Sequence, residues 1–111
     1  MNQQSFLASL RSEDHRFADT LAFIDANYSY QPSAFTNGGV HNSREQNQGS
    51  CKVLAMAVDT GLTDQQALQC FAEHYAAVLA DPQGDAHANI RALMAHGLAG
   101  VSFERQPLSR R

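Results

Sequence analysis

The segment Val53-Leu54-Ala55-Met56-Ala57-Val58 (residues 53–58) carries no charged or strongly polar side chain on any side. A helix that is apolar all round lies in the interior of a protein, so this segment predicts a central buried helix. Gly49 and Ser50 suit the start of that helix, and Gly61 suits its end. A buried strand is the alternative because the run is short, but the alanines and the methionine favour a helix.

Apolar side chains recur at helical spacing on both sides of this segment, which predicts further helices packed around it. The side chains assigned to these apolar stripes are Phe6, Leu7 and Leu10, then Phe17, Leu21, Ile24 and Tyr28, then Leu68, Phe71, Tyr75, Val78 and Leu79, and finally Ile90, Leu93 and Met94. Thr63 and Gln66 match a capping box at the start of the third of these helices, and Pro82 ends it. Asp85 suits the start of the last helix and Gly97 its end.

Residues 28–50 show no sustained period and hold Pro32 and Gly38 among Asn, Gln, Ser and His. A loop of this length in a compact domain is often functional. We expect it to be ordered, with room for a short strand or a single turn of helix. Val101 and Phe103 are expected to fold back onto the core as a short extended segment.

The predicted fold class is therefore mostly α, a compact bundle of about four or five helices with one long ordered loop. The length of 111 residues suits one domain. We expect that domain to span residues 1–111, with residues 1–5 and 104–111 as mobile tails.

Composition narrows the range of partners. Hydrophobic residues make up 43% of the chain and charged residues 17%, as in a folded domain. The net charge of -3 argues against a nucleic-acid partner. No apolar run approaches the roughly 18 residues of a membrane span, and the first residues do not resemble a Sec signal peptide. Two cysteines are too few for a disulfide scaffold, which predicts a reducing cytoplasm.

The tetrad Gly49-Ser50-Cys51-Lys52 places a thiol in the first turn of the predicted central helix. The helix dipole and Lys52 favour the thiolate at such a position. With the loop histidine His41 as a base, Cys51 and His41 become candidate catalytic residues of a cysteine-dependent hydrolase or transferase, and Asn37, Asn42 or Asn47 could complete a Cys–His–Asn arrangement. The alternatives are a cysteine that only packs in the core and one that lines an anion site at the helix start.

A polar pocket at a helix N-terminus is a second kind of candidate site. Its binding residues are expected to be Phe35, Asn37, Asn47, Gly49, Ser50, Lys52, His87, Asn89 and Arg91. His87 and Arg91 share a helix face and can reach an anionic or amide ligand, or can simply cap the helix and anchor a loop. Cys70 and His74 also share a face, but no further ligand pattern completes a zinc set, so neither a metal nor a cofactor is expected.

These segments resemble the HopJ family, small bacterial proteins named for a type III effector of plant pathogens. The matching residues are Ile24-Asp25-Ala26-Asn27-Tyr28, Ala34-Phe35-Thr36-Asn37-Gly38, Asn47-Gln48-Gly49-Ser50-Cys51-Lys52, Cys70-Phe71, His87-Ala88-Asn89-Ile90-Arg91, and Pro82, Gly84, Gly97, Gly100 and Phe103. The resemblance runs from about Phe6 to Phe103. It implies export by type III secretion as an alternative to a cytoplasmic location, and it implies no particular reaction.

Three functions follow as hypotheses. The first is a binding module for a small polar or anionic molecule or a peptide, with its pocket at a helix N-terminus. The second is the cysteine-dependent enzyme that uses Cys51 and His41. The third is a host-directed protein-interaction domain, which a flat exposed apolar patch would favour.

Overall fold

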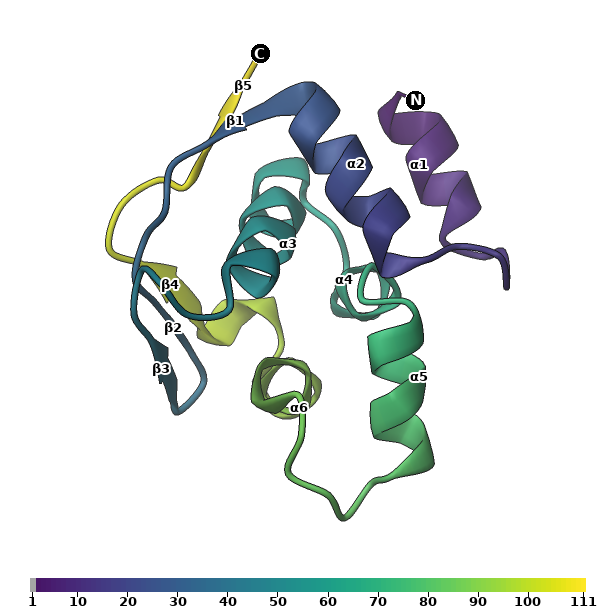
Figure 1. The fold of residues 1–111 in the computed structure, drawn as a ribbon, viewed down its shortest axis with the longest axis vertical. Coiled ribbons are helices and arrows are strands. Elements are labelled where there is room, and N and C mark those ends of the chain that lie inside the picture. The colour runs from purple at the N-terminus through teal and green to yellow at the C-terminus, as the bar shows by residue number, and fades with distance from the viewer. Residues whose placement is uncertain (1) are drawn as a thin grey trace.

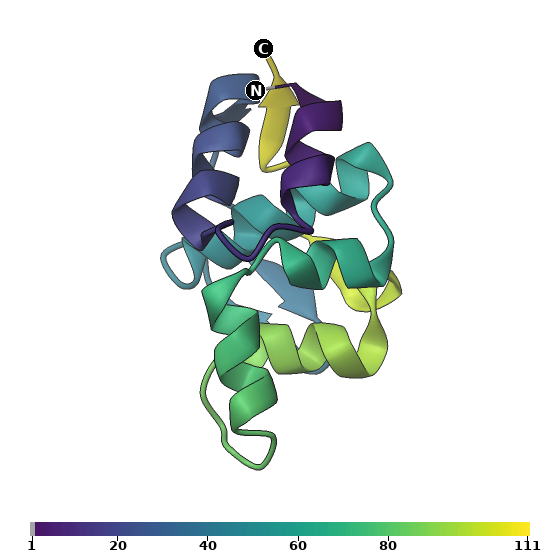
Figure 2. The same ribbon diagram turned by 90° about the vertical axis from the view of Figure 1, so that its right-hand side faces the viewer.

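The computed structural model describes residues 2–111 of the chain, and Met1 lies outside the described residues. The helices are α1 (Gln3–Ser9), α2 (Phe17–Asn27), α3 (Gln48–Thr60), α4 (Asp64–Gln69), α5 (Glu73–Ala80) and α6 (Ala88–His96), followed by the 3-10 turn η1 (Leu98–Gly100). The strands are β1 (Tyr28–Tyr30), β2 (Phe35–Asn37), β3 (Val40–Asn42), β4 (Val101–Phe103) and β5 (Leu108–Arg110). Figures 1 and 2 show α1 and β5 at one end of the molecule and the turn between α5 and α6 at the other.

Helix α3 is the central buried helix that the apolar run predicts, and Figure 1 shows it between α2 and α6. Val53 and Leu54 are fully buried. Apolar side chains of the neighbouring segments meet it in one core, which contains Ile24 of α2, Leu93 of α6, and Phe71 between α4 and α5. Leu79 and Met94, which were assigned to the same stripes, are instead exposed. The mostly α class is therefore confirmed, and so is the placement of residues 51–58 inside a helix.

The loop predicted over residues 28–50 contains three strands, so the fold is more than a helical bundle. β2 lies between β3 and β4 in one antiparallel sheet, with Thr36 opposite His41 and Ser102. β1 pairs with β5 in a second antiparallel sheet. Strands of three residues are too short to show an alternating pattern, and two of them find partners near the far end of the chain. The expected return of Val101 and Phe103 onto the core is confirmed as β4.

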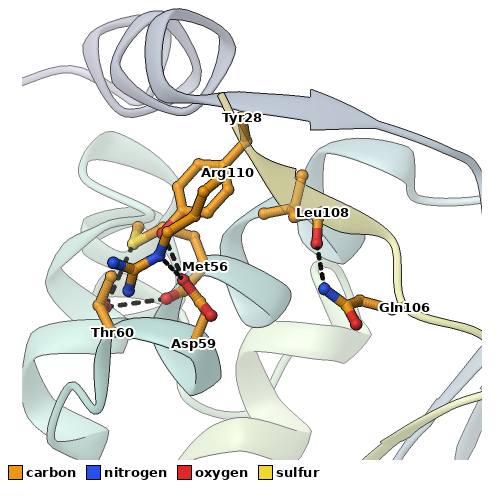
Figure 3. A network of polar contacts seen from close by, with 7 residues as sticks. All are labelled: Tyr28, Met56, Asp59, Thr60, Gln106, Leu108 and Arg110. Atoms are coloured by element: carbon orange, nitrogen blue, oxygen red, sulfur yellow. Dashed lines mark hydrogen bonds and ion pairs between the residues drawn. The ribbon is translucent and has the colours of Figure 1, made fainter.

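Residues 104–111, expected to be a mobile tail, contain the strand β5 (Leu108–Arg110), which is hydrogen-bonded to α3. Leu108 is only 4% exposed. Asp59 of α3 accepts hydrogen bonds from Tyr28 Oη at 2.7 Å and from Arg110 Nε at 2.9 Å, which joins both strands of the β1–β5 sheet to the helix (Figure 3). At the other expected tail, residues 1–5, Asn2 caps α1 by accepting the Ser5 N–H at 2.8 Å.

The helix between Thr63 and Pro82 is interrupted, which the stripe of apolar residues did not predict. α4 ends at Gln69 and α5 begins at Glu73, with Ala72 between them at φ 50°. The Thr20 hydroxyl donates to the carbonyl of Cys70 at 2.8 Å, and that carbonyl would otherwise continue the helical ladder. Within residues 2–111 each helix is too short or too polar to cross a lipid bilayer.

Candidate functional site

Helices α3 and α6 both begin in an unusual way. The chain enters α3 through Asn47 at φ 52° and enters α6 through His87 at φ 59°, both in the left-handed region. Neither side chain caps its own helix, so Ser50 and Asp85, which we expected to act as caps, do not have that role. Entry through a left-handed residue is a backbone arrangement that capping patterns in a sequence do not reveal.

The first N–H groups of these two helices are left without protein acceptors. Within residues 2–111 no hydrogen bond takes up the N–H of Gly49 or Ser50 in α3, or of Ala88 or Asn89 in α6. Cys51 is the first residue of α3 whose N–H is bonded within the turn, to the carbonyl of Asn47 at 3.0 Å. Unpaired N–H groups at a helix start carry partial positive charge and favour an anion.

Both helix starts open into the same hollow, of about 350 Å³, which we call the α3/α6 hollow. It is lined by Asn47, Gly49 and Ser50 from one helix start, by His87, Ala88, Asn89 and Ile90 from the other, and by the rings of Phe17, Phe71 and His74. None of these lining residues is Asp or Glu. The nearby carboxylate of Glu73 accepts the Phe17 N–H at 2.7 Å, and that hydrogen bond lowers the pKa of Glu73.

Four rings form a continuous wall on one side of the hollow, which we call the ring wall. Phe71 and Phe17 are stacked with centroids 5.9 Å apart and planes at 11°. The rings of Phe17 and His74 make a T-shaped contact with centroids 4.9 Å apart, and the centroids of His74 and His87 lie 5.1 Å apart. Phe17 also lies against the start of α3, where a Cβ at Gly49 would come within 3.2 Å of Phe17 Cζ. Glycine at position 49 therefore lets the ring wall approach the helix start.

A cluster of four asparagines lies behind the hollow and joins its two helix starts to the β2–β3 hairpin. The buried Asn42 Oδ1 accepts hydrogen bonds from Asn47 Nδ2 at 2.7 Å and from Asn89 Nδ2 at 3.0 Å. Asn37 Nδ2 donates to the backbone carbonyl of Asn89 at 2.8 Å. Asn37 is fully buried, and its Oδ1 has no partner among residues 2–111. The relative position of the two helix starts thus depends on Asn37 and Asn42, which lie in the segment predicted as a loop over residues 28–50.

Most of the expected binding residues come together here. Asn47, Gly49, Ser50, His87 and Asn89 line the α3/α6 hollow, although they are far apart in sequence. Asn37 lies in the asparagine cluster directly behind it.

Three expected binding residues lie elsewhere. Phe35 is buried in the sheet and lines a different hollow. Lys52 pairs with Asp25 at 3.2 Å and lies over the ring of Tyr30. The guanidinium of Arg91 donates to backbone carbonyls of residues 81, 82 and 86, so it anchors the turn before α6.

The candidate catalytic pair is not assembled. Cys51 is 1% exposed, its Sγ lies 3.8 Å from the carbonyl oxygen of Ser33, and burial raises the pKa of its thiol. This direction is opposite to the one expected for a thiol at a helix start, because burial outweighs the hydrogen bonds that would favour the thiolate. His41 is exposed on β3, where its Nδ1 lies 3.2 Å from Thr36 Oγ1. No described contact joins His41 to Cys51.

The second cysteine is buried too, and burial raises the pKa of Cys70 to about 12. Its expected partner, His74, belongs to the ring wall. Among residues 2–111, no three His, Cys, Asp or Glu side chains are grouped so that they could hold a metal ion.

Sequence reasoning missed four residues of this region. Phe17 and Phe71 were assigned only to apolar stripes, and His74 only to a zinc pair. Asn42 was considered only as one of three loop asparagines that could complete a Cys–His–Asn arrangement, and not as part of a binding site. His74 falls on the flank of an apolar stripe, which is a weak signal for a polar site, whereas nothing in the sequence marks Phe17, Phe71 or Asn42 as residues of a binding site.

The fold and hollow define a mostly helical domain with a polar, ring-lined cavity between two helix starts. The chain belongs to the HopJ family, since the model of that family, described as "HopJ type III effector protein", matches residues 3–108. A solved structure described as "Crystal structure of unknown function protein VPA0580" has 38% sequence identity and a TM-score of 0.93. It is covered over 95% of its length by the whole of this chain. No curated protein matches the chain significantly.

Proposed function

We propose that this protein binds a small anionic molecule in the α3/α6 hollow. The observation that carries the proposal is the convergence of two helix starts whose first N–H groups have no acceptor among residues 2–111. Each helix start contributes partial positive charge, and two together favour an anion more than either alone. The absence of Asp and Glu from the lining supports the same charge preference.

The donors in the hollow are backbone amides, imidazoles, a hydroxyl and carboxamides rather than Lys or Arg. Such donors recognise the shape of an anion through directed hydrogen bonds more than through net charge. Carboxylate and phosphate groups both fit this description. The ligand is therefore expected to present one such group to the N–H groups of Gly49, Ser50, Ala88 and Asn89.

Titration of the ¹⁵N-labelled protein with inorganic phosphate and with acetate tests the proposal. The amide signals of Gly49, Ser50, Ala88 and Asn89 should shift together along one saturable curve, at low ionic strength. Signals in β1 and β5, which lie away from the hollow, should stay in place. If neither anion shifts the four amide signals, the protein does not bind anions at this site.

A charge placed inside the hollow gives a matched pair of variants. Ser50→Glu adds a carboxylate in the first turn of α3, where Glu is compatible with a helix, and should abolish binding of both anions by repulsion. Gln65→Glu adds the same charge in the first turn of α4, on the exposed surface, and should leave binding unchanged. Equal losses in both variants would show that net charge, not the hollow, controls binding.

A second candidate function is contact with a host protein after type III export, which the family description supports. The observation in its favour is an exposed apolar patch that includes Leu79 at 55% exposure and Met94 at 46%. Both line one hollow between α5 and α6, next to Pro82. Comparison of culture supernatants from strains with and without a working type III apparatus tests the export step. Equal amounts in both supernatants would remove the basis of this candidate.

A further inference from the structure

We infer that the anion bound in the α3/α6 hollow carries a flat aromatic ring, which lies against the ring wall. This inference rests on the proposed function, because it names the second half of the same ligand. The wall consists of Phe17, Phe71, His74 and His87 and faces the same space as the two helix starts. When the charged group of a ligand binds the N–H groups of the helix starts, the rest of the ligand lies beside the rings of the wall.

The wall is continuous and preformed. Neighbouring centroids lie 5.9, 4.9 and 5.1 Å apart in the order Phe71, Phe17, His74 and His87. These separations fall within the range of about 4.5–7 Å at which aromatic rings attract one another through offset-stacked or edge-to-face contacts. A fifth ring added at the open side of this row would continue a pattern that the protein already makes within itself.

The solvent exposure of the rings increases from the inner end of the wall to its rim, which leaves ring surface accessible to a ligand. Phe71, at the inner end, is 2% exposed and serves as a base for Phe17. Phe17 and His74 are half-buried, and His87 is exposed at the rim. The accessible parts of Phe17, His74 and His87 thus provide apolar surface that a ligand ring would remove from water.

The size of the hollow suits a ligand with one ring and one acidic group. Its volume of about 350 Å³ lies near the lower end of the range of about 300–1,000 Å³ that small-molecule sites occupy. An aryl carboxylate or aryl phosphate is a ligand of this class. The imidazoles of His74 and His87 can in addition donate to polar atoms on the ring edge.

A graded set of phosphate esters separates the ring from the anion. The probes are inorganic phosphate, methyl phosphate, cyclohexyl phosphate and phenyl phosphate, measured by the same amide titration. Phenyl phosphate should bind at least tenfold more tightly than methyl phosphate, since both present a phosphate monoester to the helix starts. Cyclohexyl phosphate, which has similar apolar bulk without aromatic faces, should fall between them.

Two variants place the ring at the wall. His87→Asn removes an imidazole while keeping a residue that tolerates the left-handed backbone at this position. Phe17→Leu keeps an apolar side chain where Phe17 packs on the core. In both, the ratio of phenyl phosphate affinity to methyl phosphate affinity should fall toward one. His41→Asn, on the exposed surface of β3, should leave that ratio unchanged.

The outcomes separate the two proposals. If no probe binds, the anion site and the ring inference both fail. If methyl phosphate binds and phenyl phosphate binds no more tightly, the ring inference alone is overturned. Equal affinity for cyclohexyl and phenyl phosphate overturns the requirement for an aromatic ring. An unchanged ratio in both His87→Asn and Phe17→Leu overturns the placement of the ring at the wall.

Discussion

The side-chain oxygen of Asn42 accepts a hydrogen bond from Asn47 Nδ2 at 2.7 Å, and thereby joins the end of β3 to the residue through which the chain enters α3. The same oxygen accepts from Asn89 Nδ2 at 3.0 Å, in the first turn of α6. One buried carboxamide therefore holds both helix starts, and the width of the α3/α6 hollow depends on it.

Replacement of Asn42 should destabilise the protein. Asn42→Ala leaves the Nδ2 group of the buried Asn89 without its acceptor, which costs about 1–3 kcal/mol of unfolding free energy. Urea unfolding measures this loss, and Gln65→Ala on the exposed surface of α4 is the control, with a change within about 0.5 kcal/mol. A loss no larger than that of the control would show that the asparagine cluster does not support the fold.

Two adjacent glycines in the turn between β2 and β3 should respond differently to alanine. Gly38 has φ +60°, and a Cβ there would clash with the ring of His96, so Gly38→Ala should cost about 2 kcal/mol or more. Gly39 has no atom within 4 Å of an added Cβ, so Gly39→Ala should be close to neutral. Thermal unfolding of the two variants checks the contrast, and similar melting temperatures would contradict the close packing of this turn against α6.

Cys51 should react slowly with alkylating reagents in the native protein. Burial raises the pKa of its thiol and leaves the side chain 1% exposed, so both the thiolate and access to it are scarce at neutral pH. Labelling with iodoacetamide in a Cys70→Ala background should become fast only on unfolding in urea. Rapid labelling at neutral pH that slows in His41→Ala would instead revive the cysteine-dependent enzyme as a hypothesis.

His15 should make the stability depend on pH. Burial lowers the pKa of His15 below its ordinary value of 6.5, against the opposing effect of Asp19 and Glu73. The unfolded chain therefore takes up this proton more readily than the folded one. The stability contributed by neutral His15 is fully present above pH 6.5 and is lost as pH falls from 6.5 through the lower folded pKa.

Urea unfolding of the wild type and of His15→Gln at pH 7.5 and pH 5.5 measures this contribution. The wild type should lose more unfolding free energy between the two pH values than the variant does. The ring of His15 lies 2.7 Å from Thr20 Oγ1 through Nε2, and glutamine retains hydrogen-bonding groups without titrating. Parallel losses in the two proteins would show that His15 does not carry the pH dependence.

The helices of the core were predictable because burial leaves a periodic record in the sequence. Leu93 belongs to a stripe whose apolar spacing matches a face in the core, and Leu54 belongs to a continuous apolar run that favours a buried helix. The break at Ala72 was not predictable, because it coincides with a hydrogen bond from Thr20, which lies in another helix. The strand at residues 108–110 was missed for a similar reason, since its partner β1 lies near the other end of the chain.

The sequence predicted many of the residues of the candidate site, but it did not predict how they are arranged in space. Gly49, Ser50, His87 and Asn89 were selected as polar or small residues near expected helix starts, and they line one hollow. The left-handed entry that leaves their N–H groups unpaired depends on tertiary contacts. The position of Lys52 was misjudged because the direction in which a helical residue points depends on the register of the helix, and the exact helix start was not known.

The pairing of distant strands bears on what would happen if the chain were cut once in the turn between α5 and α6. Both sheets join a strand that precedes this turn to one that follows it, since β1 pairs with β5 and β2 with β4. The asparagine cluster crosses the same boundary through Asn89. These contacts between the two segments do not depend on the turn itself, so we expect them to form in a chain that is cut there. We expect the two fragments to reassemble by complementation, because neither fragment alone contains all the strands of either sheet.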